Sequence, residues 1–125
     1  MGTTTITACC APVAEAALGE DEAEQLAAAF KVLADPVRLR LLSLVANAEN
    51  GEACGCDLTE PVGRSQPTVS HHLRILRQAG MVEAEREGAY TWYRLVAGPI
   101  TKTGQALETI GQQATEAARL RRPCG

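Results

Sequence analysis

The segment 52–80 constrains the fold of this chain more than any other part of its sequence. We predict a short helix over Cys54–Val62, a tight turn at Gly63, and a second helix that begins after Ser65. Ser65 is a favourable N-cap, and Pro67 suits the first turn of the helix that follows it. Two helices joined by a tight turn predict a helix-turn-helix unit.

The residues that follow change from a helical to an alternating pattern. Alternation on both sides of the turn signal Glu87-Gly88 predicts a β-hairpin over Met81–Val96. A helix-turn-helix followed at once by a two-stranded wing is the order of a winged helix. The chain is 46% hydrophobic but only 3% aromatic, which favours packed helices built from Leu, Val, Ala and Ile. The predicted fold class is therefore mainly α with a small β-hairpin, a winged helix-turn-helix.

Three further helices are predicted around this unit. One spans Glu20–Ala34, with acidic residues at its start, where the helix dipole favours anions. The next is capped by Asp35, with Pro36 as its first residue. After Gly98-Pro99, a last helix is predicted over Ile100–Arg122. The length of 125 residues fits one domain. We assign residues 20–122 to that domain and residues 1–19 to a flexible arm that carries cysteines.

The charge is unevenly distributed along the chain. The net charge is −3, with six acids and one base in residues 1–35, yet residues 63–80 hold three arginines, both histidines and no acid. Such a helix can enter the major groove, with polar residues at base edges and arginines at phosphates. The alternative interpretation is that these polar residues form the solvated face of an ordinary helix. The candidate DNA contacts are Arg64, Ser65, Gln66, Thr68, Ser70, His71, Arg74 and Arg77, with Arg86 in the hairpin.

Four of the five cysteines form two close pairs, Cys9-Cys10 and Cys54-x-Cys56. On a regular helix, residues two apart project about 200° from each other, so Cys54 and Cys56 share an ion only where the helix start is distorted. Otherwise one of the two binds and the other is a bystander. In either case the ligand count is short, and Cys9 or Cys10 must complete it from the arm. Three thiolates suit As(III) or Sb(III), and four suit a tetrahedral Zn(II) or Cd(II). We treat Cys124 as a tail thiol.

Other readings of the cysteines remain open. They can oxidise, which would make the chain a thiol-redox sensor, or they can be inert in a constitutive DNA-binding protein. The sequence has no nucleophile–base pair, phosphate loop or Cys-x-x-Cys motif, so we do not expect an enzyme. No apolar run approaches the roughly 18 residues of a membrane span, and no secretory signal is visible. We expect a cytoplasmic protein, a compartment in which thiols stay reduced.

Three segments of this sequence together resemble one family. EACGCDL, then SQPTVSHHLRILRQAG, then a wing that ends in TWYRL are similar to the ArsR/SmtB family of metal-responsive repressors, and most similar to its arsenite-responsive branch. The resemblance covers roughly half of the chain. It implies a homodimer formed through the first and last helices, here 20–34 and 100–122. It further implies that the apo protein binds double-stranded operator DNA and that As(III) or Sb(III), the inducer, releases it.

The sequence departs from the family pattern in two places. Thr59 and Glu60 stand where a third ligand would be sought, and neither is a thiol. The chain therefore resembles members that recruit cysteines from the N-terminal arm, which leaves Cd(II) or Pb(II) sensing through four cysteines open. The last helix carries Glu108 and Glu116 but no histidine, so the zinc-type site between paired last helices is not expected.

Overall fold

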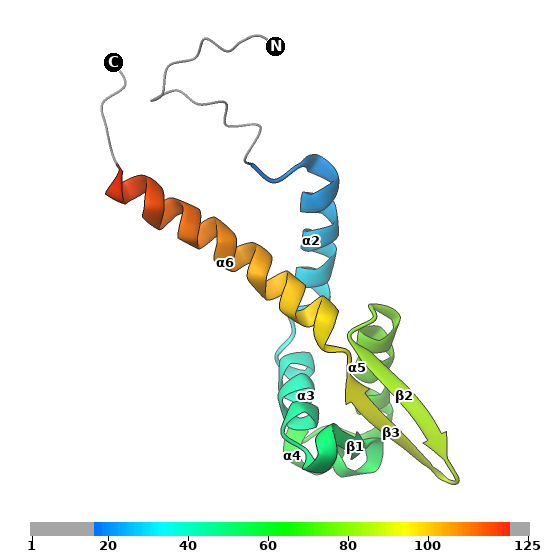
Figure 1. The fold of residues 1–125 in the computed structure, drawn as a ribbon. Helices are drawn as coiled ribbons and strands as arrows, with labels where there is room; N and C mark the ends of the chain where they lie inside the picture. The colour runs from blue at the N-terminus through cyan, green and yellow to red at the C-terminus, as the bar shows by residue number, and fades with distance from the viewer. Residues whose placement is uncertain (1–16, 121–125) are drawn as a thin grey trace.

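The structure is a computed structural model that describes residues 17–120 (Figure 1). Helices α2 and α6 stand on one side of the molecule, and the winged helix lies on the other. The helices are α2 (Glu20–Leu33), α3 (Pro36–Ala46), α4 (Thr59–Val62), α5 (Gln66–Gln78) and α6 (Ala97–Arg119), and the strands are β1 (Glu52–Cys54), β2 (Val82–Glu87) and β3 (Tyr90–Leu95). Short 3₁₀ turns at Glu49–Gly51 and Gly55–Asp57 flank β1. The mainly helical winged-helix fold is thereby confirmed.

Local capping explains where several helices begin. The Asp35 carboxylate accepts hydrogen bonds from the backbone N–H groups of Val37 and Arg38 at 2.8 and 3.2 Å, and so satisfies two free donors at the start of α3. Ser65 Oγ accepts from the Thr68 N–H at 3.4 Å and caps α5. Gly63 ends α4 with φ = 71°, in the left-handed region that favours glycine. The predicted caps of α3 and α5 are confirmed.

The sheet has one more strand than the predicted hairpin. Strands β2 and β3 pair antiparallel from Val82↔Leu95 to Glu87↔Tyr90, as the hairpin prediction requires. Strand β1 adds to the other edge of β3, which gives the order β1-β3-β2. In that added pair Cys54 stands opposite Trp92.

The predicted helix over Cys54–Val62 is wrong in its first half. Cys54 ends a strand, a 3₁₀ turn follows, and only Thr59–Val62 is α-helical. The pairing of Glu52, Ala53 and Cys54 with β3 supplies backbone hydrogen bonds to this segment, so strand pairing outweighs local helix propensity. The cysteines therefore precede the helix-turn-helix instead of lying on its first helix.

The core lies where α3, α5 and the sheet meet. Six side chains at its centre are at most 2% exposed: Leu41, Val45, Val69, Leu73, Leu76 and Met81. Around them pack Val37, Leu42, Ala53, Leu58, Val62 and Val82. This core anchors one face of α5 and leaves its other face exposed.

Helix α6 begins at Ala97, three residues before the predicted start. Gly98 and Pro99 lie inside its first turn, where a proline removes no intrahelical hydrogen bond. Its later turns carry the exposed apolar side chains Leu107 and Ile110. No helix within residues 17–120 is long and apolar enough to cross a membrane.

Candidate thiol site and nucleic-acid interface

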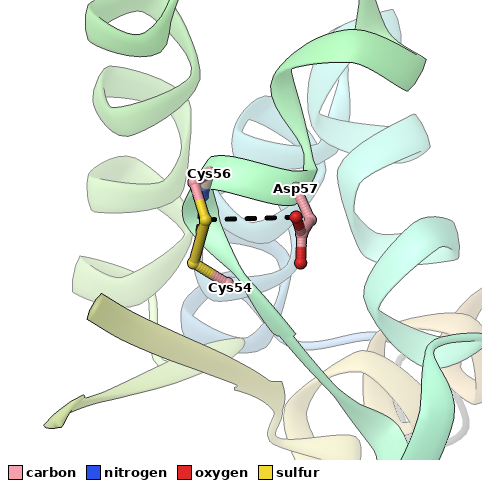
Figure 2. Close-up of side chains that lie close together, drawn as sticks. All are labelled: Cys54, Cys56 and Asp57. Carbon is pink, nitrogen blue, oxygen red and sulfur yellow. Dashed lines mark hydrogen bonds between the residues drawn. A yellow bond between two sulfur atoms is a disulfide. The ribbon is translucent and has the colours of Figure 1, made fainter. Parts of the chain in front are cut away.

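The cysteine pair lies at the turn between β1 and α4 (Figure 2). Cys54 is buried, with 4% exposure, whereas Cys56 and Asp57 are exposed. The two cysteine Cα atoms are 5.3 Å apart and the sulfurs are joined as a disulfide. Cys56 Sγ lies 4.0 Å from Asp57 Oδ1, and the ligand atoms of all three side chains lie within 4.8 Å of one another. The fold thus gathers two sulfurs and a carboxylate at one point.

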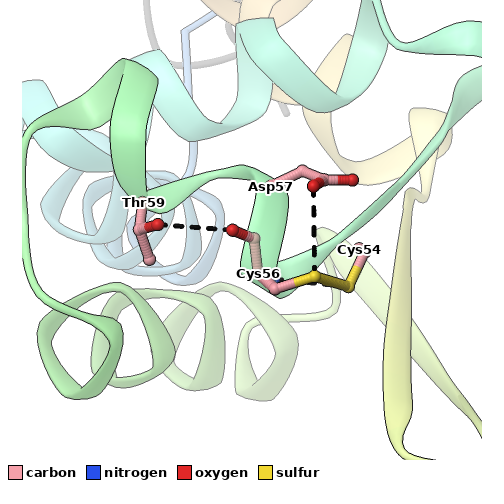
Figure 3. Close-up of a disulfide and its surroundings, with 4 residues drawn as sticks. All are labelled: Cys54, Cys56, Asp57 and Thr59. Carbon is pink, nitrogen blue, oxygen red and sulfur yellow. Dashed lines mark hydrogen bonds between the residues drawn. A yellow bond between two sulfur atoms is a disulfide. The ribbon is translucent and has the colours of Figure 1, made fainter.

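Two local hydrogen bonds hold this turn in shape. The Cys56 N–H donates to Cys54 Sγ at 3.3 Å. The Thr59 hydroxyl donates to the Cys56 carbonyl oxygen at 3.3 Å (Figure 3). Thr59 therefore ties the turn to α4.

The donor set of the turn fits a soft or borderline cation once the disulfide is reduced. Cys54 and Cys56 would then offer two thiolates, the ligands that thiophilic ions prefer, and Asp57 an oxygen. Two thiolates are fewer than the three or four ligands that such ions take in proteins. Cys9, Cys10 and Cys124 lie outside the described residues.

Helix α5 presents the polar face that the sequence predicted. Arg64, Gln66, His71, Arg74 and Arg77 are exposed, as is Ser65, while Thr68 and Ser70 are half-buried. The Ser65 hydroxyl also donates to Thr68 Oγ1 at 3.0 Å, so these two side chains shape the helix start. The opposite face, which carries Val69, Leu73 and Leu76, is buried in the core. The apolar face of α5 is thus packed in the core and its polar face is exposed, as insertion into a DNA groove requires.

The wing contributes one exposed arginine and one paired arginine. Arg86 is exposed on β2, and its Nε donates to the Gly88 carbonyl oxygen at 3.4 Å. Arg94 on β3 makes ion pairs with Glu52, Glu83 and Glu85 at 3.2 to 3.3 Å. Hydrogen bonds to Glu85, Glu83 and Glu52 raise the pKa of Arg94 above its usual value. Arg94 therefore joins the three strands, whereas Arg86 remains an exposed arginine of the wing.

Hydrogen bonds of the Arg38 side chain connect α5 to α3 and α2. Arg38 Nε donates to His72 Nδ1 at 3.1 Å, and Arg38 Nη1 donates to the Val32 carbonyl oxygen at 2.9 Å. Burial lowers the pKa of His72, and the Arg38 charge adds to this, while Asp35 opposes it. Burial alone would raise the pKa of Asp35, but hydrogen bonds from the Arg38 and Val37 backbone lower it overall. His72 is half-buried, whereas His71 is exposed.

The thiol turn and the start of α5 border one cavity. It has a volume of about 140 Å³, and its lining includes Cys54, Cys56, Gln66, Ser70 and Tyr93. Two of these are candidate ligands and two are candidate DNA contacts. The two predicted sites are therefore adjacent.

Three residues beside the thiols are not among the predicted site residues. Asp57 follows Cys56 directly, so its position in the sequence could have suggested it as an oxygen ligand. Trp92 and Tyr93 reach the site only because β3 pairs with β1, and no local pattern near the cysteines indicates them.

Comparison with known proteins identifies the family of this chain. Residues 35–84 match the family model described as bacterial regulatory protein, arsR family. An uncharacterized HTH-type transcriptional regulator of Methanocaldococcus jannaschii is 45% identical over 73 residues, which cover 58% of this chain and 80% of that protein. A Halobacterium salinarum protein with the provisional name of arsenical resistance operon repressor is 37% identical and covers 82% of this chain and 81% of its own. Several other relatives are matched over about half of their length, 50% to 55%.

Solved structures agree with the sequence matches. The crystal structure of an antimony-specific transcriptional repressor, AntR, has a TM-score of 0.61 and 29% identity, and the match covers 86% of this chain and 99% of that one. The family consists of transcriptional regulators, which are not enzymes. The family model matches residues 35–84, and the Halobacterium relative is 37% identical and covered over 81% of its length, so the chain belongs to the arsR family of bacterial regulatory proteins.

Proposed function

We propose that this protein is a homodimeric transcriptional repressor that binds operator DNA and dissociates when As(III) or Sb(III) binds its thiolates. The observation that carries the proposal is the shared cavity, in which Cys54 and Cys56 border Gln66 and Ser70 of α5. An ion bound by these sulfurs would lie beside the residues that read DNA. Binding at one site then alters the other through direct contact.

The DNA-binding part of the proposal rests on α5 and the wing. The exposed face of α5 carries arginines and no acid, although the whole chain has a net charge of −3. Gln66 and Ser70 are suited to base edges, and Arg64, Arg74, Arg77 and Arg86 to phosphates. Each phosphate contact would make binding weaker as salt rises.

The choice of inducer rests on the donor atoms and on the relatives. Two thiolates of the turn, completed by Cys9 and Cys10 of the arm 1–19, provide three or four sulfur ligands. Three sulfurs suit As(III) or Sb(III), and the names of the Halobacterium relative and of AntR refer to these two elements. Four sulfurs would suit Cd(II) or Pb(II) instead.

Dimerisation is proposed to use α2 and α6. The exposed apolar side chains Leu107, Ile110 and Leu120 lie on or at the end of α6, and Leu18 precedes α2. A cavity of about 280 Å³ between the two helices is lined by Leu18, Leu26 and Ala29 among others. Large exposed apolar side chains on one element favour burial against a partner. Residues 20–122 would then form one DNA-binding and dimerisation domain.

The test measures inducer binding and DNA release in the same sample. Trp92 is the only tryptophan and stands opposite Cys54 in the β1–β3 pair, where the Cβ atoms of opposite residues are typically about 5 Å apart. Its fluorescence should therefore change when an ion binds Cys54. Fluorescence anisotropy of labelled promoter DNA reports release. The reductant must be a phosphine, because dithiols compete for arsenite.

The expected result is a change in Trp92 fluorescence that coincides with DNA release as arsenite is added. Cys54→Ser/Cys56→Ser should abolish both signals and retain DNA binding, and Cys9→Ser/Cys10→Ser should weaken both. Cys124→Ser is the matched control and should behave as wild type. Release of DNA from the Cys54→Ser/Cys56→Ser variant by arsenite would refute the proposal. Release by Cd(II) but not by arsenite would refute the choice of inducer.

A second candidate function is thiol-redox sensing, favoured by the disulfide between Cys54 and Cys56. Peroxide would oxidise the two thiols to a disulfide with loss of two electrons and two protons, and would itself be reduced to two waters. Release of DNA by peroxide in the absence of any metal, together with a mass lower by two hydrogens, would support this function. Unchanged DNA binding by the oxidised protein would exclude it.

A further inference from the structure

The contact that joins the thiol turn to the DNA-reading elements is made at Gly55. This residue lies between the two cysteines and is buried. A Cβ atom built on Gly55 would stand 3.2 Å from Tyr93 Cε2 and 3.8 Å from Gln66 Nε2. The Tyr93 ring is therefore seated directly against the backbone that links Cys54 to Cys56. Any larger residue at position 55 would have to displace that ring.

We propose that Tyr93 is the positioning residue that transmits ion binding at the thiols to α5 and the wing. This inference rests on the proposed function. Tyr93 belongs to β3, one of the two strands of the wing, and its ring borders the cavity that also holds Gln66 and Ser70. A shift of the ring would therefore displace both α5 and the wing, the two elements proposed to contact DNA.

In this proposal, ion binding acts on the backbone at Gly55, which links the two sulfur ligands. An ion bound by both sulfurs would hold them at one fixed separation, whereas two free thiols rotate independently. The residue between the two ligands has to adapt to that geometry. Because the Tyr93 ring is already in close contact with Gly55, the adaptation displaces the ring.

Tyr90, the other tyrosine of the cavity, does not make this connection. Tyr90 lines the same cavity but is 57% exposed at the tip of the wing, so its ring has room to move without displacing a neighbour. Tyr93 is half-buried and packs against the hydrophobic core. The difference between the two tyrosines provides a matched pair of variants.

The experiment measures the coupling between the two ligands. The dissociation constant of the reduced protein for promoter DNA is measured with and without saturating arsenite, and the arsenite dissociation constant is measured from Trp92 fluorescence with and without DNA. Linkage requires the two ratios to agree, and coupling of this kind is typically about 5- to 150-fold. Tyr93→Leu should bring both ratios to within about threefold of one. Its affinities for DNA alone and for arsenite alone should stay within about threefold of wild type.

The controls separate coupling from folding. Tyr93→Phe keeps the ring and should retain the wild-type ratios, and so should Tyr90→Leu. If Tyr93→Leu does not fold, Gly55→Ala tests the same contact from the other side, because the added Cβ, 3.2 Å from Tyr93 Cε2, shifts the ring by a few tenths of an ångström. Gly55→Ala should lower the ratios at least threefold.

The outcomes distinguish this inference from the proposed function. Full coupling in folded Tyr93→Leu, or in Gly55→Ala if the first variant is unfolded, would overturn the role of Tyr93 and leave the repressor function standing. A wild-type protein that binds no arsenite, or that holds DNA equally well with arsenite bound, would overturn both.

Discussion

Acidification should destabilise this protein through one hydrogen bond on the back of α5. His72 Nδ1 accepts a hydrogen bond from Arg38 Nε at 3.1 Å, and Arg38 also binds the Val32 carbonyl oxygen at the end of α2. Protonation of His72 occupies Nδ1, removes the acceptor and places two positive charges together. We therefore expect the Arg38–His72 hydrogen bond, which connects α3 to α5, to be lost in mild acid.

The sign and window follow from the direction of the pKa shift. Burial holds the pKa of His72 below its usual 6.5, Arg38, His71 and Arg64 add to this, and Asp35 opposes it. The unfolded chain therefore binds the proton first as pH falls. The stabilisation is complete above pH 6.5 and is lost as the pH falls below that value, levelling off under the folded pKa. Asp35, whose pKa is also lowered, loses its contribution only below pH 3.8.

The size of the effect comes from the hydrogen bond itself. A hydrogen bond to a charged group contributes about 1.5 to 3 kcal/mol when buried, and partial exposure of this pair reduces that to about 1 kcal/mol. The slope cannot exceed about 1.4 kcal/mol per pH unit, because one proton is involved. For a chain of this length, the loss corresponds to a fall of about 4 °C in Tm.

The assay is urea unfolding at a fixed protein concentration from pH 8 to pH 5, for wild type and His72→Gln. A glutamine side-chain oxygen can accept a hydrogen bond but does not titrate in this range. The wild type should lose about 1 kcal/mol more than His72→Gln between pH 7 and pH 5. His71→Gln should retain the wild-type loss, because the Arg38–His72 hydrogen bond remains. Parallel pH profiles of wild type and His72→Gln would refute the reasoning.

Three further predictions concern the cap, the core and the thiol turn. Asp35→Ala removes the two hydrogen bonds at the start of α3 and should cost about 1 kcal/mol in urea unfolding at pH 7, and Asp35→Asn should restore most of it. Leu76→Ala empties a fully buried position on α5 and should cost about 2 to 5 kcal/mol, whereas Leu39→Ala, at a position 52% exposed, should cost less than about 1 kcal/mol. Asp57→Ala should weaken Cd(II) binding about tenfold and leave arsenite binding unchanged, as measured by Trp92 fluorescence, because an oxygen ligand matters less to the softer ion. Glu60→Ala, an exposed acid three residues further on, is the control for loss of charge.

The parts of the fold that the sequence predicted correctly are those written in local patterns. The cap at Asp35, the cap at Ser65 and the hairpin turn at Gly88 each depend on a few neighbouring residues, because capping and turn chemistry act over one turn of chain. The exposed face of α5 was also predictable from a local pattern, because helical periodicity alone separates Arg74 and Arg77 from the buried Leu73 and Leu76.

The prediction failed where distant strands pair. Residues 52–54 have no strand signal of their own, and they become a strand because β3, about 40 residues further along the chain, offers an edge with free hydrogen-bonding groups. That pairing converts the expected helix start at Cys54 into a strand end and a tight turn, and so brings the two cysteine sulfurs together.

The sequence alone determined which residue types are available: two thiols and a carboxylate in four residues, and a helix of arginines without acids. Only the tertiary structure decided that these two features share a cavity, that Tyr93 contacts Gly55, and that His72 binds Arg38. The physical reason is that hydrogen bonds and close contacts between residues far apart in the chain depend on how the elements pack, and packing leaves no mark in the local pattern of either partner.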